Sequence, residues 1–233
     1  GSRNINEATD LLSVIMLQAG SPMVAKGFGR ADFGQEGEKA VTFYTGFANP
    51  RSGTQYTWDQ SMHYSLDAFA EESVAMIFNY AYQVPQLKTK NPFLNIGVAP
   101  MPQFKDAKKL INYANYWGLA VSKKTAEPEL AWKFVKDSAL DPAINGRYLN
   151  ATNRPPALRS LIGPNQNDPD FGIFVRQALT AISWPQVDAT AIDAIFTQML
   201  DLINTGRLPL ETAVQQAEPQ ISTLMQRRAD NLQ

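Results

Sequence analysis

Two stretches of the sequence decide the expected fold: VAMIFNYAYQVPQLKTKNPFLNIGVAPMPQ at residues 74–103 and INYANYWGLAVS at residues 111–122. Residues 74–78 form an apolar, partly β-branched run, which is typical of a buried strand. Residues 95–99 repeat the pattern before two prolines, and residues 119–121 are a third short apolar run. The pattern predicts three core strands and, with the helices expected elsewhere, an α/β fold.

Aromatic and amide side chains gather beside these predicted strands. They are Asn79, Tyr80, Tyr82, Asn115, Tyr116 and Trp117. In open α/β sheets, ligands bind outside the carboxyl ends of strands, in concave sites lined by aromatic rings and a few polar groups. The sequence therefore predicts a ligand site formed by these residues. The alternative is that each ring lies at the edge of the core, with its polar tip in water.

Composition is that of a globular protein with balanced charge. The 233 residues are 44 % hydrophobic and 18 % charged, which is enough for a real core in one or two domains. The net charge is −1, which argues against nucleic acid or an anionic membrane surface as the main partner. There is no cysteine, so disulfides and thiolate metal sites are excluded. No apolar stretch reaches the roughly 18 residues of a membrane span, and Gly1-Ser2 is interpreted as a cloning scar.

Helices are predicted in eight segments. In all of them except residues 145–152 and 171–182, apolar residues recur three or four positions apart, which is the pattern of a helix with one buried face. The predicted helices are one capped by Asn6 or Thr9 that ends at residues 18–22, and others over residues 38–48, 61–71, 125–139, 145–152, 171–182, 189–203 and 210–230.

The sequence carries no recognisable catalytic pattern. It has no G-x-S-x-G, no Walker loop, no H-E-x-x-H and no complete G-x-G-x-x-G. His63 is the only histidine and lacks the partners of a metal site or a triad, so a surface or half-buried role is favoured. Glu71 and Glu72 point different ways on a predicted helix and cannot flank one glycosidic bond. We therefore expect no enzymatic activity, and no metal or organic cofactor is implied; a carbohydrate-active enzyme is the alternative.

Five short segments, in their order, carry a resemblance to a known family. They are SLDAFAEESVAMIFNYAYQ, VAPMPQ, NYANYWGLAVSKK, AWKFVKDSA and RPPALRSLI. In this order the chain resembles the later part of extracellular solute-binding protein family 1, the sugar-binding components of ABC importers that include maltose-binding proteins. The resemblance covers residues 6–226. Whole members begin with a signal peptide and an entire first sheet, so the chain is expected to be a truncated fragment whose fold lacks its front part.

The resemblance implies a two-lobed α/β fold of the type II periplasmic binding protein kind, with the sugar in an aromatic-lined cleft between the lobes. Residues 3–117 and 168–233 are then expected to form the second lobe, and residues 118–167 a segment of the first. The chain would cross between lobes near residues 115–118 and 165–170. Gly118 would allow the first crossing to turn, and Trp117 would lie at the cleft floor with one edge open to solvent.

Two more ligand-binding candidates come from the resemblance. Members of the family place a loop at the cleft where Arg154-Pro155-Pro156 stands in this sequence, so Arg154 is expected to donate to a ligand hydroxyl or carboxylate. They also place an aromatic loop from the region of Trp184 against the sugar. The alternatives are a salt-bridged loop arginine and an aromatic helix stop.

The function implied by the resemblance is that of a substrate-binding component of an ABC importer, holding a mono- or oligosaccharide without chemistry. Its expected partners are a sugar and the permease subunits, with no nucleic acid. The expected location is periplasmic or extracellular in a bacterium, where the missing N-terminus could carry a lipid anchor. A ligand-sensing lobe for a membrane receptor is a further alternative.

The predicted helix at residues 125–139 has an apolar stripe without an evident partner in the chain. The stripe consists of Leu130, Ala131, Phe134 and Val135, with Trp132 beside it. A sheet from the front of the fold would normally cover such a stripe. We therefore expect it to be covered by the missing N-terminal portion or a second copy of the chain, or else repacked.

Overall fold

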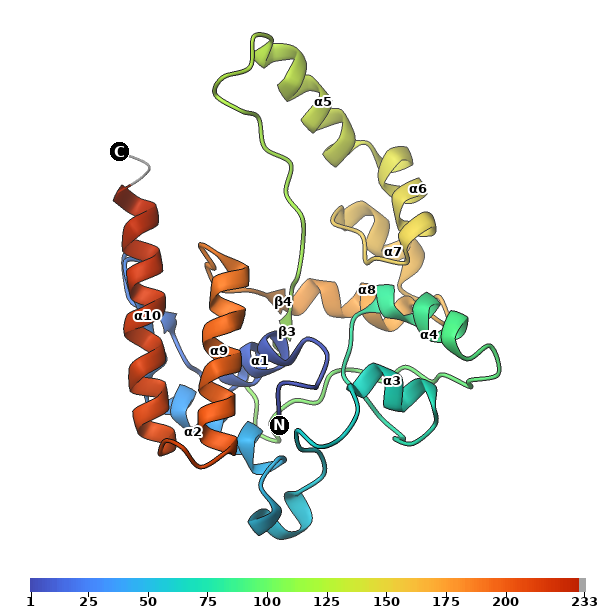
Figure 1. Ribbon diagram of the computed structural model, residues 1–233. Coiled ribbons are helices and arrows are strands. Elements are labelled where there is room, and N and C mark those ends of the chain that lie inside the picture. Colours follow the sequence, from blue (N-terminus) through green and yellow to red (C-terminus); the bar gives the residue numbers. More distant parts are fainter. Residues whose placement is uncertain (231–233) are drawn as a thin grey trace. The chain divides into compact units, whose positions relative to one another are not determined.

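The computed structural model describes residues 1–230, with side chains through Arg227, and consists of two compact units (Figure 1). Unit 1 is made of Gly1–Asn79, Gln103–Tyr113 and the chain from Ile182 onward. Unit 2 is made of Tyr80–Pro102 and Ala114–Ala181. Residues 80–102 thus belong to the same unit as residues 114–181, whereas the family resemblance groups residues 3–117 in one lobe. The units reflect contacts within this chain, and the lobe assignment stays a prediction.

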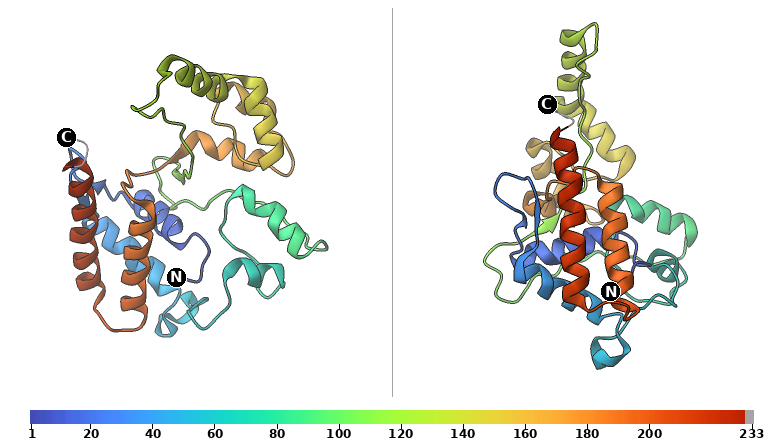
Figure 2. Two further views of the ribbon diagram at one scale, coloured as in Figure 1. Left: turned by 45° about the horizontal axis from the view of Figure 1, so that its top comes forward. Right: turned by 60° about the vertical axis from the view of Figure 1, so that its left-hand side comes forward.

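Unit 1 is mostly helical. Its long helices occur in two sequential pairs, one near each end of the chain (Figure 2). The elements of unit 1 are α1 (Ala8–Ala19), β1 (Met23–Val24), β2 (Ala31–Asp32), α2 (Gly34–Gly46), the 3-10 helix η1 (Pro50–Gln55), α3 (Ser65–Ala70), β3 (Asn112–Tyr113), α9 (Ala189–Asn204) and α10 (Leu210–Asp230). The short strand β4 (Ala181–Ile182) contains the boundary between the units.

Unit 2 consists of helices and long irregular segments. Its elements are η2 (Ala81–Gln83), α4 (Val84–Lys90), α5 (Pro128–Leu140), α6 (Pro142–Thr152), η3 (Arg159–Leu161), α7 (Ile162–Asn165), α8 (Gly172–Gln177) and η4 (Ala178–Thr180). Buried apolar side chains are sparse here and include Leu87, Leu149, Ile162 and Val175. Asp141 begins α6 by accepting hydrogen bonds from the backbone N–H groups of Ala143 and Ile144, at 2.8 and 3.0 Å.

The core of unit 1 is centred on the ring of Phe196. Phe33 meets this ring edge-on, with centroids 5.6 Å apart, and Trp184 stacks on it at 6.2 Å. All three side chains are buried, together with Leu12 and Val41. Aromatic pairs in these geometries add to the free energy of burial. The three rings therefore fasten α9 to the loops that precede α2 and α9.

Side chains of α10 complete the hydrogen bonding of the β1–β2 ribbon. The two strands are antiparallel, with Met23 opposite Asp32 and Val24 opposite Ala31. At the free edge of β2, the N–H of Ala31 donates to the Ser222 hydroxyl at 3.0 Å. Just beyond the strand, the N–H of Phe33 donates to the Glu218 carboxylate at 2.5 Å. A two-stranded ribbon is marginal alone, and α10 supplies the acceptors that its edge needs.

The first two residues are packed into unit 1. Ser2 is fully buried and its carbonyl accepts from the Tyr44 hydroxyl at 3.3 Å. The carbonyl of Gly1 accepts from the Asn204 amide at 3.0 Å. Burial lowers the pKa of the Gly1 α-amino group from 8.0 to about 5. The amine therefore stays neutral at pH 7 in the folded chain, while the origin of Gly1-Ser2 in cloning stays a prediction.

Most predicted helices are confirmed, with shifted ends. The segments at residues 38–48, 125–139, 145–152, 189–203 and 210–230 correspond to α2, α5, α6, α9 and α10. Two predicted helices are shorter than expected: 61–71 is reduced to α3, and 171–182 to α8 followed by a 3-10 turn and β4.

The predicted cap of the first helix is wrong. Glu7, in a left-handed conformation, precedes α1 and provides no side-chain cap. Asn6 instead accepts from the backbone N–H of Leu66 in α3, at 2.9 Å. The sequence pattern of a cap shows that a side chain can accept a hydrogen bond from a backbone N–H group. Here the Asn6 side chain accepts this bond from α3 and not from α1.

The three predicted core strands are not formed. Residues 74–78, 95–99 and 119–121 have no regular structure, and Met76 and Leu119 are 83 % and 58 % exposed. An apolar run becomes a strand only when another strand accepts its hydrogen bonds and its side chains are covered. Neither condition is met for these runs among the described residues. The prediction of three core strands is therefore corrected: in the described part of the chain, which is mostly helical, the sheets are limited to two-residue strands.

Removing the central ring should destabilise unit 1. For Phe196→Ala we expect the free energy of unfolding to fall by roughly 3 to 5 kcal/mol, because Phe33 and Trp184 lose their shared partner and a cavity remains. Urea denaturation followed by circular dichroism measures this change. Phe28→Ala is the matched control, since Phe28 is 65 % exposed and its loss should cost less than about 0.5 kcal/mol. Equal losses in the two variants would contradict the role of the Phe196 ring.

The buried N-terminus should make stability depend on pH. Between pH 5 and pH 8 the unfolded chain binds a proton at its α-amino group and the folded chain does not, so the free energy of unfolding should rise as pH rises through this window. Urea denaturation at pH 5, 6.5 and 8 tests the direction. A ¹⁵N label on Gly1 reports the amine directly by NMR. Titration of the folded chain near pH 8 would show that the amine is solvated.

Candidate functional site

Three of the predicted ligand-binding residues lie together in unit 2. The rings of Tyr80 and Tyr82 are stacked, with centroids 5.8 Å apart and planes inclined by 13°. The guanidinium carbon of Arg154 lies 4.9 Å from the centroid of the Tyr82 ring. All three side chains are half-buried. We call this group the tyrosine–arginine cluster.

Local backbone geometry presents both tyrosines. Tyr80 is extended and immediately precedes η2, and its carbonyl accepts from the N–H of Gln83 at 3.0 Å. The chain then continues into α4, where Pro85 occupies the first turn and loses no hydrogen bond. The two rings, separated by one alanine, are thus fixed at a turn whose backbone is hydrogen-bonded.

The end of α6 positions Arg154. Asn153 adopts a left-handed conformation, with φ 51° and ψ 36°, and its N–H donates to the Leu149 carbonyl at 2.9 Å. Asparagine tolerates this conformation better than most residues, so it ends the helix cleanly. Pro155 follows and restricts Arg154 to extended backbone. The side chain of Arg154 therefore leaves the chain from a stiff turn.

Two polar side chains of this region, Arg154 and Gln83, have an unmet charge or hydrogen bond within the described residues. Within the part of the chain that the structure describes, no carboxylate forms a salt bridge with Arg154. The side-chain carbonyl oxygen of Gln83 is buried and accepts no hydrogen bond from the described residues. A buried acceptor without a donor costs about 1 to 3 kcal/mol, and such groups are uncommon away from functional sites. The Arg154 guanidinium is therefore the donor that this region offers to a ligand, whereas the Gln83 oxygen is enclosed.

Gln83 was not predicted from the sequence. A single glutamine in a turn has no pattern that separates it from any other polar residue. Its position directly after Tyr82 is the only signal that would have suggested it.

The other predicted residues of the same region are not part of this group of stacked rings. Asn79 is half-buried and directly precedes Tyr80 in the chain. Asn115, Tyr116 and Trp117 lie on an exposed irregular segment, and Trp117 is 85 % exposed. Their role in binding stays a prediction. The role given to Gly118 is corrected: its φ is not positive and the space beside it is open, so the turn does not require a glycine.

Trp184 belongs to the core of unit 1. Its side chain is 5 % exposed, its ring stacks on Phe196, and its indole N–H donates to the Ser13 hydroxyl at 3.1 Å. A ring with both its face and its polar tip satisfied inside the protein has nothing left for a ligand. The structure therefore corrects the prediction that Trp184 binds sugar.

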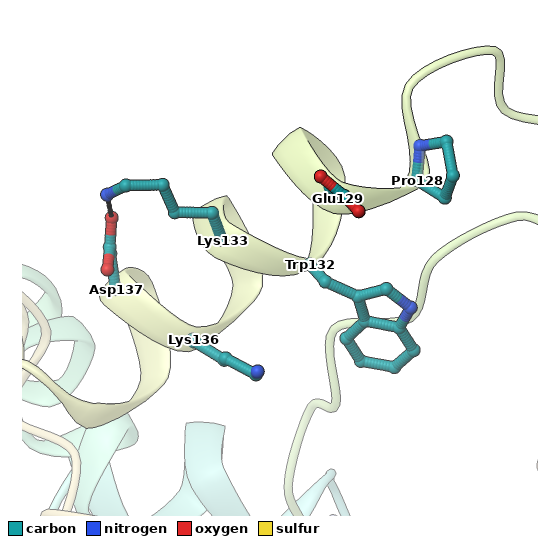
Figure 3. A pocket seen from close by; sticks show the side chains of 6 residues that line it. All are labelled: Pro128, Glu129, Trp132, Lys133, Lys136 and Asp137. Carbon is teal, nitrogen blue, oxygen red and sulfur yellow. Dashed lines mark hydrogen bonds and ion pairs between the residues drawn. The ribbon is translucent and has the colours of Figure 1, made fainter.

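Helix α5 has an apolar face and a charged face, and neither carries convergent polar groups. Residues 119–121 and the predicted apolar stripe line an open hollow of about 420 Å³. Leu130, Phe134 and Trp132 are 64 %, 65 % and 49 % exposed, and no residue of α5 is buried. On the charged face, Lys133 pairs with Asp137 at 2.5 Å and the Trp132 indole projects away from the helix (Figure 3). Among the described residues the apolar stripe is thus left exposed, and what covers it stays a prediction.

The fold is that of periplasmic binding proteins. The chain is similar to an ABC transporter solute-binding protein from Thermotoga lettingae TMO bound with alpha-D-tagatose, at 23 % identity and a TM-score of 0.67, covering 94 % of this chain and 57 % of that one. It is also similar to the maltotriose-binding protein of Thermus thermophilus bound with maltotriose, at 19 % identity and a TM-score of 0.62, covering 92 % and 58 %. The chain thus spans less than two thirds of these solved structures.

A sequence match identifies the family of this chain. Residues 2–136, more than half of the chain, match the bacterial extracellular solute-binding protein family. The chain belongs to this family. A comparison with curated proteins found no match.

The open face of α5 predicts self-association. Size-exclusion chromatography with light scattering should give a mass that rises with protein concentration, because exposed apolar patches of this kind are usually covered by another surface. Phe134→Glu should shift the mass toward the monomer. Lys136→Glu, on the charged face of the same helix, is the control and should leave it unchanged. A monomer at every concentration would show that the face needs no second copy.

Proposed function

We propose that the protein is the carbohydrate-binding component of an ABC importer and holds its sugar without chemical change. Membership of the solute-binding family and the likeness to structures described with tagatose and maltotriose support this proposal. The observation that carries it in this chain is the tyrosine–arginine cluster.

The cluster has the chemistry that a sugar requires. The C–H face of a pyranose is apolar and packs against an aromatic ring, while its hydroxyls need donors and acceptors at the ring edge. Tyr80 and Tyr82 supply rings, and the Arg154 guanidinium supplies N–H donors. Asn79, Asn115, Tyr116 and Trp117 are proposed as further contacts from the rest of the site.

The proposed lobe organisation follows the family resemblance. Residues 3–117 and 168–233 are assigned to the second lobe and residues 118–167 to the first. The sugar would occupy the cleft between the lobes of the whole protein. The open face of α5 would be covered by another part of the whole protein or by a second copy of the chain.

The proposed partners and location follow from the same role. The partners are a sugar and the permease subunits of the importer. The proposed location is periplasmic or extracellular, in accord with the family description. No helix among the described residues has both the length and the hydropathy to cross a bilayer.

Loss of the stacked ring should weaken sugar binding. For Tyr82→Ala we expect a loss of roughly 1 to 3 kcal/mol, which is about 5- to 150-fold in Kd, because the ring is the contact surface and also the support of Arg154. Isothermal titration calorimetry against mono- and oligosaccharides gives the affinities. Tyr64→Ala, which removes a 57 % exposed ring of unit 1, is the control and should bind normally.

A hydrolysis assay on the same sugars distinguishes binding from catalysis. Heat of binding without product supports the proposal. Accumulation of product would establish an enzyme instead, and an unchanged Kd in Tyr82→Ala would remove this ring from the site.

A further inference from the structure

Arg154 differs from the other cations whose contacts are known in the described chain. Arg3 and Arg30 form salt bridges with Asp201 and Asp32, at 3.2 and 3.9 Å. Arg176 donates to the Gln166 carbonyl. For Arg154 the contact is the face of the Tyr82 ring, and no described carboxylate neutralises it although the side chain is half-buried. A partly desolvated cation without a counter-charge is costly unless a ligand supplies one.

The two segments that build the cluster contain basic residues and no acidic ones. Within unit 2, residues 80–102 contain Lys88 and Lys90 and no Asp or Glu. Between Asp141 and Asp168 the sequence has three arginines, at positions 147, 154 and 159, and again no Asp or Glu. Both segments therefore carry an excess of positive charge, in a chain whose net charge is −1. Such a field attracts anions and repels cations.

We propose that the natural ligand of this site is an acidic saccharide, with a uronate carboxylate bound by Arg154. The inference rests on the proposed sugar-binding function and specifies the class of sugar. The Arg154 guanidinium lies over the Tyr82 ring, with its central carbon 4.9 Å from the ring centroid. A guanidinium held at an aromatic face can still donate two parallel N–H hydrogen bonds to a carboxylate. The stacked Tyr80 extends the aromatic surface beside the Tyr82 ring.

Matched ligands that differ only in charge test the proposal. The ligands are trimers of galacturonate and of mannuronate, each compared with its methyl ester, which has the same ring and linkage without the negative charge. Calorimetry on the 233-residue chain should show at least one acid bound ten-fold or more tightly than its ester. Because charge carries the difference, the ratio should shrink between 50 mM and 500 mM salt.

Variants then assign the preference to Arg154. Arg154→Gln should reduce the affinity for the acid to that of the ester and change the affinity for the ester less than three-fold. Arg154→Lys should keep part of the preference, because it retains the charge and loses the planar fork. Arg159→Gln removes the same charge from an exposed position of the same segment and should keep most of the preference. Thermal melting of each variant verifies that it folds.

The outcomes separate this inference from the function on which it rests. Equal affinity for acid and ester, or a preference that survives in Arg154→Gln, overturns the acidic ligand while sugar binding stands. If Arg159→Gln loses as much of the preference for the acid as Arg154→Gln does, the preference comes from the overall positive charge, and the direct contact with Arg154 is overturned. Failure of the acids, the esters and the neutral sugars alike to bind overturns the proposed function itself.

Discussion

The burial of one phenylalanine ring holds unit 1 together. Phe196 lies in α9, Phe33 in the loop before α2 and Trp184 in the loop before α9, and their rings meet in one cluster. Phe33 also donates its backbone N–H to the carboxylate of Glu218 in α10. Ring packing and edge hydrogen bonding thus act on the same residue, which is why a ribbon of two-residue strands is ordered at all.

The same packing explains which sequence predictions were correct. Helices α9 and α10 were predicted almost to the residue because periodicity is local and their apolar stripes have partners in the chain. The runs at 74–78 and 119–121 are also apolar. A strand, however, forms only when it pairs with a second strand, and a local sequence pattern does not show whether that second strand is present. Trp184 was misplaced for a related reason: a tryptophan after a helix gives the same signal whether its ring faces solvent or, as here, Phe196.

The sequence predicted which residues form the candidate site but not how their side chains are arranged. The alternation of aromatic and small residues at 79–82 marked the two tyrosines, and the family resemblance added Arg154. That the guanidinium rests on Tyr82 depends on how α6 ends, where a left-handed Asn153 and the following prolines set the direction of the chain. The orphan oxygen of Gln83 is a property of packing alone, and only coordinates reveal it.

The two units also differ in what stabilises them. Unit 1 has a continuous apolar core, whereas unit 2 buries few apolar side chains and leaves α5 uncovered. Segments with few buried contacts open at low free-energy cost, and binding sites are often drawn from them. A ligand held between the turn at Tyr82 and the turn at Arg154 would join two parts of unit 2 that are far apart in sequence. Because it would bind only the ordered arrangement, its binding energy would add to the stability of unit 2 by mass action. Ligand occupancy and order in unit 2 are therefore coupled.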